Sequence, residues 1–131
     1  MFGKLLRVAY GISVAEGWNE PTPDGKLPQG TASYHNHNPG NLRASPYQVG
    51  TSPDGFAIFR SDIEGFMGLA HQLTLYAQDK TKFVPPNDTI GDVIAVYAGL
   101  DKTSPQFNNY VTIIEKVAGV SRNDTIESIL E

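Results

Sequence analysis

The chain has 131 residues and no cysteine, which excludes disulfides, thiol nucleophiles and zinc–thiolate sites. Its length, with 40% apolar and 18% charged residues, is typical of a globular protein, and we expect residues 1–131 to form a single domain. The net charge of −4 argues against a nucleic-acid partner, because such proteins need a basic face to neutralise phosphates.

Residues 2–16 are predicted to form the first helix. Three apolar residues and one glutamate recur there at helical spacing: Leu5, Ala9, Ile12 and Glu16. Gly17 is a plausible stop. The stretch superficially resembles a signal sequence, but Gly11 and Ser13 break its apolar run and no clear cleavage site follows. No apolar stretch reaches the roughly 20 residues that cross a bilayer, so we expect no membrane insertion.

The segment from about 18 to 60 is rich in turn signals. Asn38-Pro39-Gly40-Asn41 and Asp54-Gly55 are both typical of tight turns. Residues 56–59 are predicted to form a short strand, within a small antiparallel sheet or hairpin pair. His35 and His37 are two residues apart, but no acidic cluster completes a metal site. We therefore expect neither a metal nor a cofactor.

The remainder of the chain is predicted to be helical. Ser61 and Glu64 form a capping-box pattern before a helix. The face of that helix expected to point inward carries Ile63, Phe66, Met67, Ala70, Leu73 and Tyr76 or Ala77. Thr89 is expected to cap a second helix.

Two further helices follow in the predicted order. Ser104-Pro105 starts one, which Gly119 ends, and Asp124 with Glu127 indicates a last short helix. The fold class is therefore α+β, with about five helices around a small antiparallel sheet.

Glu16 is the candidate catalytic residue. It lies one turn after Ile12 on the apolar face of the first predicted helix, so it faces the core. Burial disfavours the charged form of a carboxyl group, and a general acid must carry a proton to give to a glycosidic oxygen. On helical position alone, a purely structural buried glutamate is an equally good interpretation.

Three stretches resemble lysozyme-like domains of bacteriophage and bacterial proteins. They are Ala15-Glu16-Gly17-Trp18-Asn19, the segment 34–43 (YHNHNPGNLR), and Gly55–Phe59 before a capped helix. In those domains an "AEG" helix end precedes an "NNPGNLR" turn. The layout is also similar to goose-type lysozymes and lytic transglycosylases. The resemblance implies a lysozyme-like fold in which the catalytic glutamate ends one helix, a small sheet follows and a helical lobe closes the groove.

The resemblance implies cleavage of peptidoglycan glycan strands at the bond between N-acetylmuramic acid and N-acetylglucosamine, as a lytic transglycosylase or a muramidase. Glu16 matches the catalytic acid. The substrate-binding residues it implies are Asn38, Asn41, Arg43, Tyr97 and Tyr110, and we add Trp18 and Tyr34 as aromatic residues that could stack on sugars. The asparagines could equally be pure turn formers, and the two later tyrosines could be ordinary core residues. This chain has Ala98 where transglycosylases have asparagine.

A second carboxylate would be needed for inverting hydrolysis. Asp24 is the candidate, although a turn with Gly25 explains it better. A single acid is the pattern of lytic transglycosylases. The alternatives are a chitinase-like hydrolase and a non-catalytic wall-binding or virion structural module. With no clear signal peptide, we expect the chain to be virion-associated or delivered to the periplasm or cell wall, within a larger phage or secretion assembly.

Overall fold

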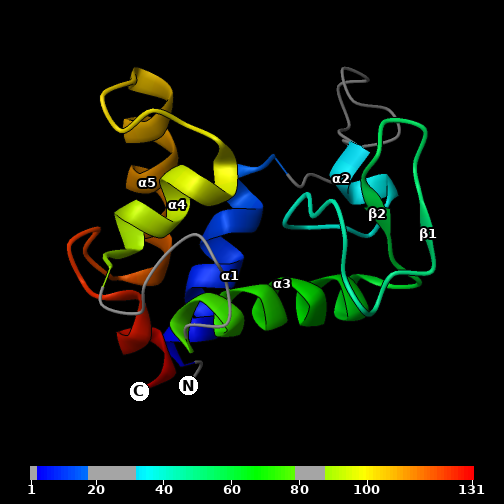
Figure 1. The fold of residues 1–131 in the computed structure, drawn as a ribbon, viewed down its shortest axis with the longest axis horizontal. Coiled ribbons are helices and arrows are strands. Elements are labelled where there is room, and N and C mark those ends of the chain that lie inside the picture. The colour runs from blue at the N-terminus through cyan, green and yellow to red at the C-terminus, as the bar shows by residue number, and fades with distance from the viewer. Residues whose placement is uncertain (1–2, 18–31, 79–87) are drawn as a thin grey trace.

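The computed structural model describes residues 3–17, 32–78 and 88–131, which form the α+β fold expected from the sequence (Figure 1). In chain order the elements are α1 (Lys4–Ala15), α2 (Ala32–His35), β1 (Gly50–Thr51), β2 (Ala57–Ile58), α3 (Asp62–Ala77), α4 (Ile90–Ala98), α5 (Pro105–Ala118) and the 3-10 helix η1 (Ile126–Leu130). Among the described residues four helices exceed two turns, namely α1, α3, α4 and α5. The fifth helix expected from the sequence is the short 3-10 turn η1, and α2 was not predicted.

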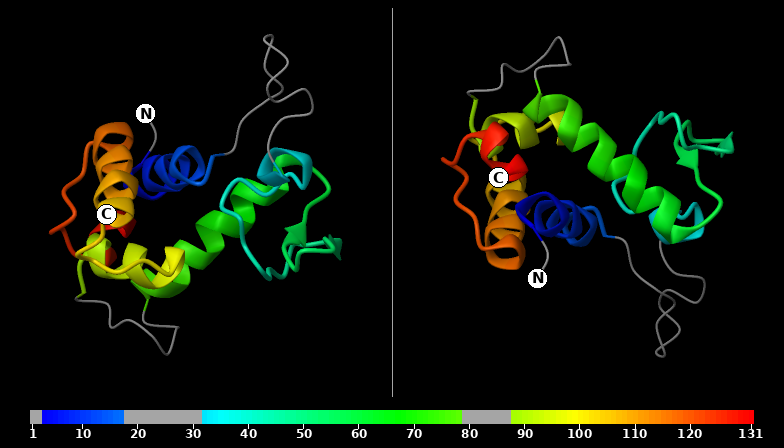
Figure 2. Two further views of the ribbon diagram at one scale, coloured as in Figure 1. Left: turned by 90° about the horizontal axis from the view of Figure 1, so that it is seen from above. Right: turned by 90° about the horizontal axis from the view of Figure 1, so that it is seen from below.

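The elements form two lobes that α3 connects. Helices α1, α4, α5 and η1 gather into a helical lobe, and α2 lies with the two strands in a hairpin lobe (Figures 1 and 2). The strands pair antiparallel, with Gly50 opposite Ile58 and Thr51 opposite Ala57. In the helical lobe α1 packs against both α3 and α5. One cluster of buried apolar residues fills this lobe, and a smaller one of Leu42, Ala57 and Phe59 lies under the hairpin.

Local sequence signals set the helix boundaries. The side chains of Ser61, Thr89 and Ser104 each accept a backbone hydrogen bond at the start of α3, α4 and α5. Gly99 and Gly119 end α4 and α5 at φ of 65° and 68°, a conformation that favours glycine. None of the helices in the described ranges combines the length and apolarity of a bilayer-spanning segment.

The predicted inward face of α3 was partly wrong. Ile63 and Met67 are 75% and 47% exposed, whereas Gly65, Gly68 and Leu69 are buried. The cause is that apolar residues surround the first half of this helix, so their spacing does not select one side. The side that is covered carries two glycines, which a search for apolar side chains passes over.

Those glycines allow the hairpin lobe to lie directly on the backbone of α3. A Cβ atom at Gly65 would be 1.9 Å from the carbonyl oxygen of His37 and 2.7 Å from Cδ of Pro39. A Cβ at Gly68 would be 2.9 Å from Cε1 of Phe59. Contacts this short leave no room for any side chain. The 36–40 turn can therefore take this position only because α3 has no side chain at Gly65.

Replacing Gly65 by alanine tests this contact. Helix propensity alone predicts that alanine stabilises the protein by about 1 kcal/mol. The overlap with His37 predicts the opposite, a loss of about 2–4 kcal/mol in the free energy of unfolding. Urea unfolding followed by circular dichroism measures the sign. Gly50→Ala is the control, because its nearest neighbour would be 3.9 Å away and stability should change by less than about 0.5 kcal/mol.

Candidate functional site

Glu16 is the residue that ends α1. Its backbone is still helical, at φ −78° and ψ −3°, and its N–H donates to the carbonyl oxygen of Ile12 at 2.8 Å. Gly17 follows at φ 76°, the left-handed region, and turns the chain away from the helix axis. Glu16 is partly buried, so the helix end presents its carboxyl group at the boundary between core and solvent.

Two donors from distant segments hold the carboxyl group. Nδ2 of Asn41 donates to Oε1 at 3.3 Å, and the hydroxyl of Tyr110 donates to Oε2. These partners are 25 and 94 residues from Glu16 in the sequence. The turn supplies one donor and α5 the other. Because each oxygen has its own donor, the orientation of the carboxyl plane is set from two sides.

The turn that carries Asn41 is held by a buried asparagine. Asn38 has no exposed surface, and its Nδ2 donates at 2.9 Å to the carbonyl oxygens of both Leu42 and Ala57. Its Oδ1 accepts from the backbone N–H of Leu42, also at 2.9 Å. Every contact is therefore to backbone, and a ligand cannot reach this side chain in the structure. Of the two interpretations of Asn38 from sequence, the structure favours the turn former.

Asn41 lies at the end of this turn and is half-buried. Its φ is 51°, a left-handed conformation that asparagine tolerates better than most residues. The amide is thereby directed to Glu16. A second bond ties the same turn to the helical lobe, since the hydroxyl of Tyr97 on α4 donates to the carbonyl oxygen of Gly40. A Cβ atom at Gly40 would be 2.6 Å from that hydroxyl, so the approach requires glycine.

Burial raises the pKa of both tyrosines, and the negative charge of Glu16 raises each further. For Tyr110 the hydrogen bond to Glu16 acts in the same direction. Both hydroxyls therefore keep their protons and remain donors over the whole neutral range. Ordinary core packing explains their rings, but it does not explain hydroxyls aimed at a carboxyl group and at the turn.

A polar pocket of about 250 Å³ lies beside these residues. It is lined by Asn41, Leu42, Arg43, Ala44, Gln72, Tyr76 and Tyr97. The guanidinium of Arg43 lies 4.2 Å from the ring centre of Phe56 and donates to the carbonyl oxygen of Asp54 at 3.1 Å. Gln72 was not predicted from the sequence as a site residue. Its only signal was its position one turn before Tyr76, on a helix face expected to be inward.

The remaining predicted residues are less closely connected to Glu16. Tyr34 is partly buried on α2. Trp18 and Asp24 lie outside the described residues. His37 pairs through Nδ1 with Oδ1 of Asp62 at 2.8 Å, which ties the turn to the start of α3. No group of three or more His, Asp or Glu residues in the described ranges is placed to hold a metal ion.

Comparison of the chain with known protein families, with curated proteins and with solved structures gave no match. The site itself consists of a carboxyl group with two fixed hydrogen-bond donors beside a polar pocket.

The buried tyrosines predict a steep loss of stability at alkaline pH. Above pH 10, the usual pKa of tyrosine, the unfolded chain loses these protons while the folded protein keeps them. The free energy of unfolding should then fall by about 1.4 kcal/mol per pH unit for each tyrosine. Urea unfolding at a series of pH values from about 8 to about 11 measures the slope.

Tyr97→Phe should remove one tyrosine's share of that slope. Tyr10→Phe, which removes an exposed hydroxyl, is the matched control and should unfold with the wild-type pH dependence. Equal slopes in the wild type and in Tyr97→Phe would show that the hydroxyl of Tyr97 does not keep its proton in the folded protein.

Proposed function

We propose that the chain cleaves the glycan strands of peptidoglycan, with Glu16 as the general acid. The observation that carries the proposal is the carboxyl group of Glu16, which accepts one hydrogen bond on each oxygen from two separate elements. A structural glutamate would be satisfied as well by neighbouring backbone N–H groups. Two side-chain donors on different elements give a fixed direction, which proton transfer needs.

The surroundings of Glu16 support a sugar substrate. Its partner Asn41 also lines the polar pocket, together with Gln72 and Arg43. Amide and guanidinium groups can hydrogen-bond the hydroxyl and N-acetyl groups of an aminosugar. The order of helix-end glutamate, turn, small sheet and helical lobe is also what the resemblance to lysozyme-like domains implies. The lysozyme-like fold is part of this proposal.

The proposed chemistry uses one carboxyl group twice. Glu16 donates its proton to the glycosidic oxygen as the bond to the muramyl C1 breaks, and N-acetylglucosamine leaves with a free 4-hydroxyl. The carboxylate then accepts a proton from the group that attacks C1. In a transglycosylase that group is the muramyl 6-hydroxyl, and a 1,6-anhydro ring closes. In a muramidase it is water, and a reducing end forms. In either case Glu16 is again protonated.

Asp24, the candidate second carboxylate, lies outside the described residues. The proposal favours the transglycosylase branch because a single acid is the pattern of the lytic transglycosylases that the sequence resembles. The proposal also includes a phage or secretion assembly that delivers the chain to the cell wall.

Glu16→Gln is the decisive variant, because glutamine keeps the shape of the side chain but cannot donate the acid proton. We expect the release of fragments from purified peptidoglycan to fall by at least about 100-fold. Mass spectrometry of the fragments distinguishes anhydro-muramyl from reducing muramyl ends. Glu127→Gln, which changes an exposed glutamate on η1, is the control and should release fragments at the wild-type rate.

The products decide between the branches. Anhydro ends that disappear in Glu16→Gln identify a transglycosylase, and reducing ends that disappear identify a muramidase. Release from chitin alone would support the chitinase-like alternative. If the wild type binds peptidoglycan without cleaving it, and Glu16→Gln binds equally, the enzymatic proposal is wrong and a wall-binding module replaces it.

A further inference from the structure

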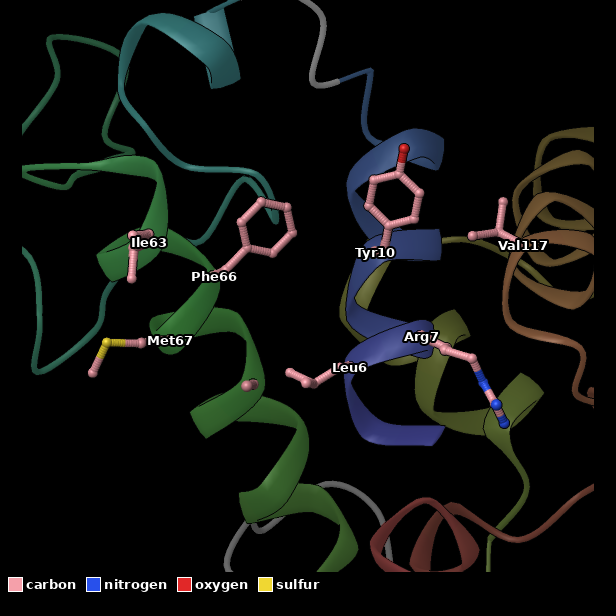
Figure 3. Close-up of a pocket in the computed structure, with 8 residues that line it drawn as sticks. Leu6, Arg7, Tyr10, Ile63, Phe66, Met67 and Val117 are labelled. Atoms are coloured by element: carbon pink, nitrogen blue, oxygen red, sulfur yellow. The ribbon is translucent and has the colours of Figure 1, made fainter. Parts of the chain in front are cut away.

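A hollow of about 760 Å³ lies between α1 and α3, and its lining is mostly apolar (Figure 3). Leu6 extends from α1 toward α3, and Phe66 extends from α3 toward α1. Sugar hydroxyl groups placed against such a lining would lose hydrogen bonds to water without gaining others. A glycan is better accommodated by the polar pocket beside Glu16, whose described lining offers amide, hydroxyl and guanidinium groups.

Arg43 is the one charged side chain in the described lining of that polar pocket. It is exposed, and none of the ion pairs between described residues includes it. Asn41, which donates to Glu16, lines the same pocket. A positive charge beside the candidate acid is therefore available to a negative group of the ligand that the pocket receives.

The guanidinium of Arg43 is held by its neighbours in the hairpin lobe. Nη1 donates to the carbonyl oxygen of Asp54 at 3.1 Å, and the guanidinium carbon lies 4.2 Å from the ring centre of Phe56. A Cβ atom at Gly55, whose φ is 88°, would be 3.1 Å from Nη1. Among the hydrogen bonds between described residues, Arg43 uses Nη1 alone. The edge formed by Nε and Nη2 is left to donate to both oxygens of a carboxylate.

We propose that Arg43 binds a carboxylate carried by the muramyl residue of the substrate and makes the site prefer peptidoglycan over chitin. The inference rests on the proposed function for the identity of the sugar. Both polymers contain N-acetylglucosamine, but muramic acid adds a lactyl ether that ends in a carboxyl group. In a strand without peptides this group is a free carboxylate. In the intact wall it is amide-linked to a stem peptide, which has carboxylates of its own.

The charge of the whole chain makes a local cation necessary. With a net charge of −4, the protein gives no long-range attraction to an anionic wall, so an anionic substrate must be recognised by contacts inside the pocket. The carboxylate form of Glu16 adds to the repulsion. Arg43 offsets it, and the planar, fixed guanidinium matches a planar carboxylate better than a flexible ammonium would.

A comparison of ligands tests the inference without any change at Arg43. Titration calorimetry with the Glu16→Gln variant, which should not consume the ligands, measures the affinity for oligosaccharides of equal length. They are the N-acetylglucosamine oligomer, the oligomer alternating with N-acetylmuramic acid, its lactyl amide, and its form carrying L-alanyl-D-glutamate. A carboxylate-bearing oligomer should bind at least about tenfold more tightly than the lactyl amide. Preference for the free lactyl form identifies that group as the ligand, and preference for the peptidyl form alone identifies the stem peptide.

Substitution of Arg43 in the same background assigns the preference to this side chain. Arg43→Gln should bring the affinity ratio of the carboxylate form to the amide form close to one. Arg43→Lys should keep only part of the ratio, because an ammonium is a point charge without the fork of donors. Arg60→Gln is the matched control: it removes the same charge from an exposed arginine that follows β2 and is not in the described pocket lining, so the ratio should stay high.

The outcomes separate this inference from the proposed function. Equal affinities for the carboxylate and amide forms, including no measurable binding of either, would overturn the inference, as would the same ratio in Arg43→Gln and Arg60→Gln. The ligand comparison decides alone if Arg43→Gln does not fold. Carboxylate preference in a chain whose wild type releases no fragments refutes the proposed cleavage and keeps the role of Arg43. Cleavage without the preference refutes only the inference.

Discussion

The contact between the 36–40 turn and the bare side of α3 is the constraint on which the rest of the site depends. Gly65 lets the carbonyl group of His37 lie against the helix, and Asn38 closes the turn above it through three backbone hydrogen bonds. Leaving those backbone groups without partners would cost on the order of 1–3 kcal/mol each. The position of Asn41, and therefore of one donor to Glu16, follows from this packing rather than from any interaction with a substrate.

The candidate site is consequently a product of the whole fold. The carboxyl group comes from the end of α1, one donor from the turn and the other from α5, and Tyr97 on α4 holds the turn in place. Each of these segments is positioned by packing elsewhere: α1 and α5 by the core of the helical lobe, and the turn by α3. A substitution far from Glu16 can therefore change its surroundings.

Features that arise from neighbouring residues were predictable from the sequence. The caps at Thr89 and Ser104 and the end of α5 at Gly119 are local, and they were predicted correctly. The end of α4 at Gly99 was not predicted, although it also depends on a local signal. The inward side of α3 was predicted only in part. Gly65 and Gly68 are buried there, but they have no apolar side chain that would indicate burial in the sequence. The hydrogen bond from the hydroxyl of Tyr110 to Glu16 could not be predicted for another reason. It joins residues that are 94 positions apart in the sequence, and no spacing rule relates them. Glu16 could be identified as a candidate because its place on the apolar face of α1 follows from the spacing of neighbouring residues. Its catalytic role stays a prediction.

The two donors to Glu16 belong to different lobes. Tyr110 is in the helical lobe with the carboxyl group, whereas Asn41 is in the turn that rests on α3. Any hinge motion that moved the hairpin lobe away would break the Asn41 bond and the Tyr97–Gly40 bond together, and it would keep the Tyr110 bond. An open state would thus leave Oε1 of Glu16 accessible while Oε2 stays anchored. The motion that opens the site to a ligand would therefore also free Oε1 of Glu16 to contact that ligand.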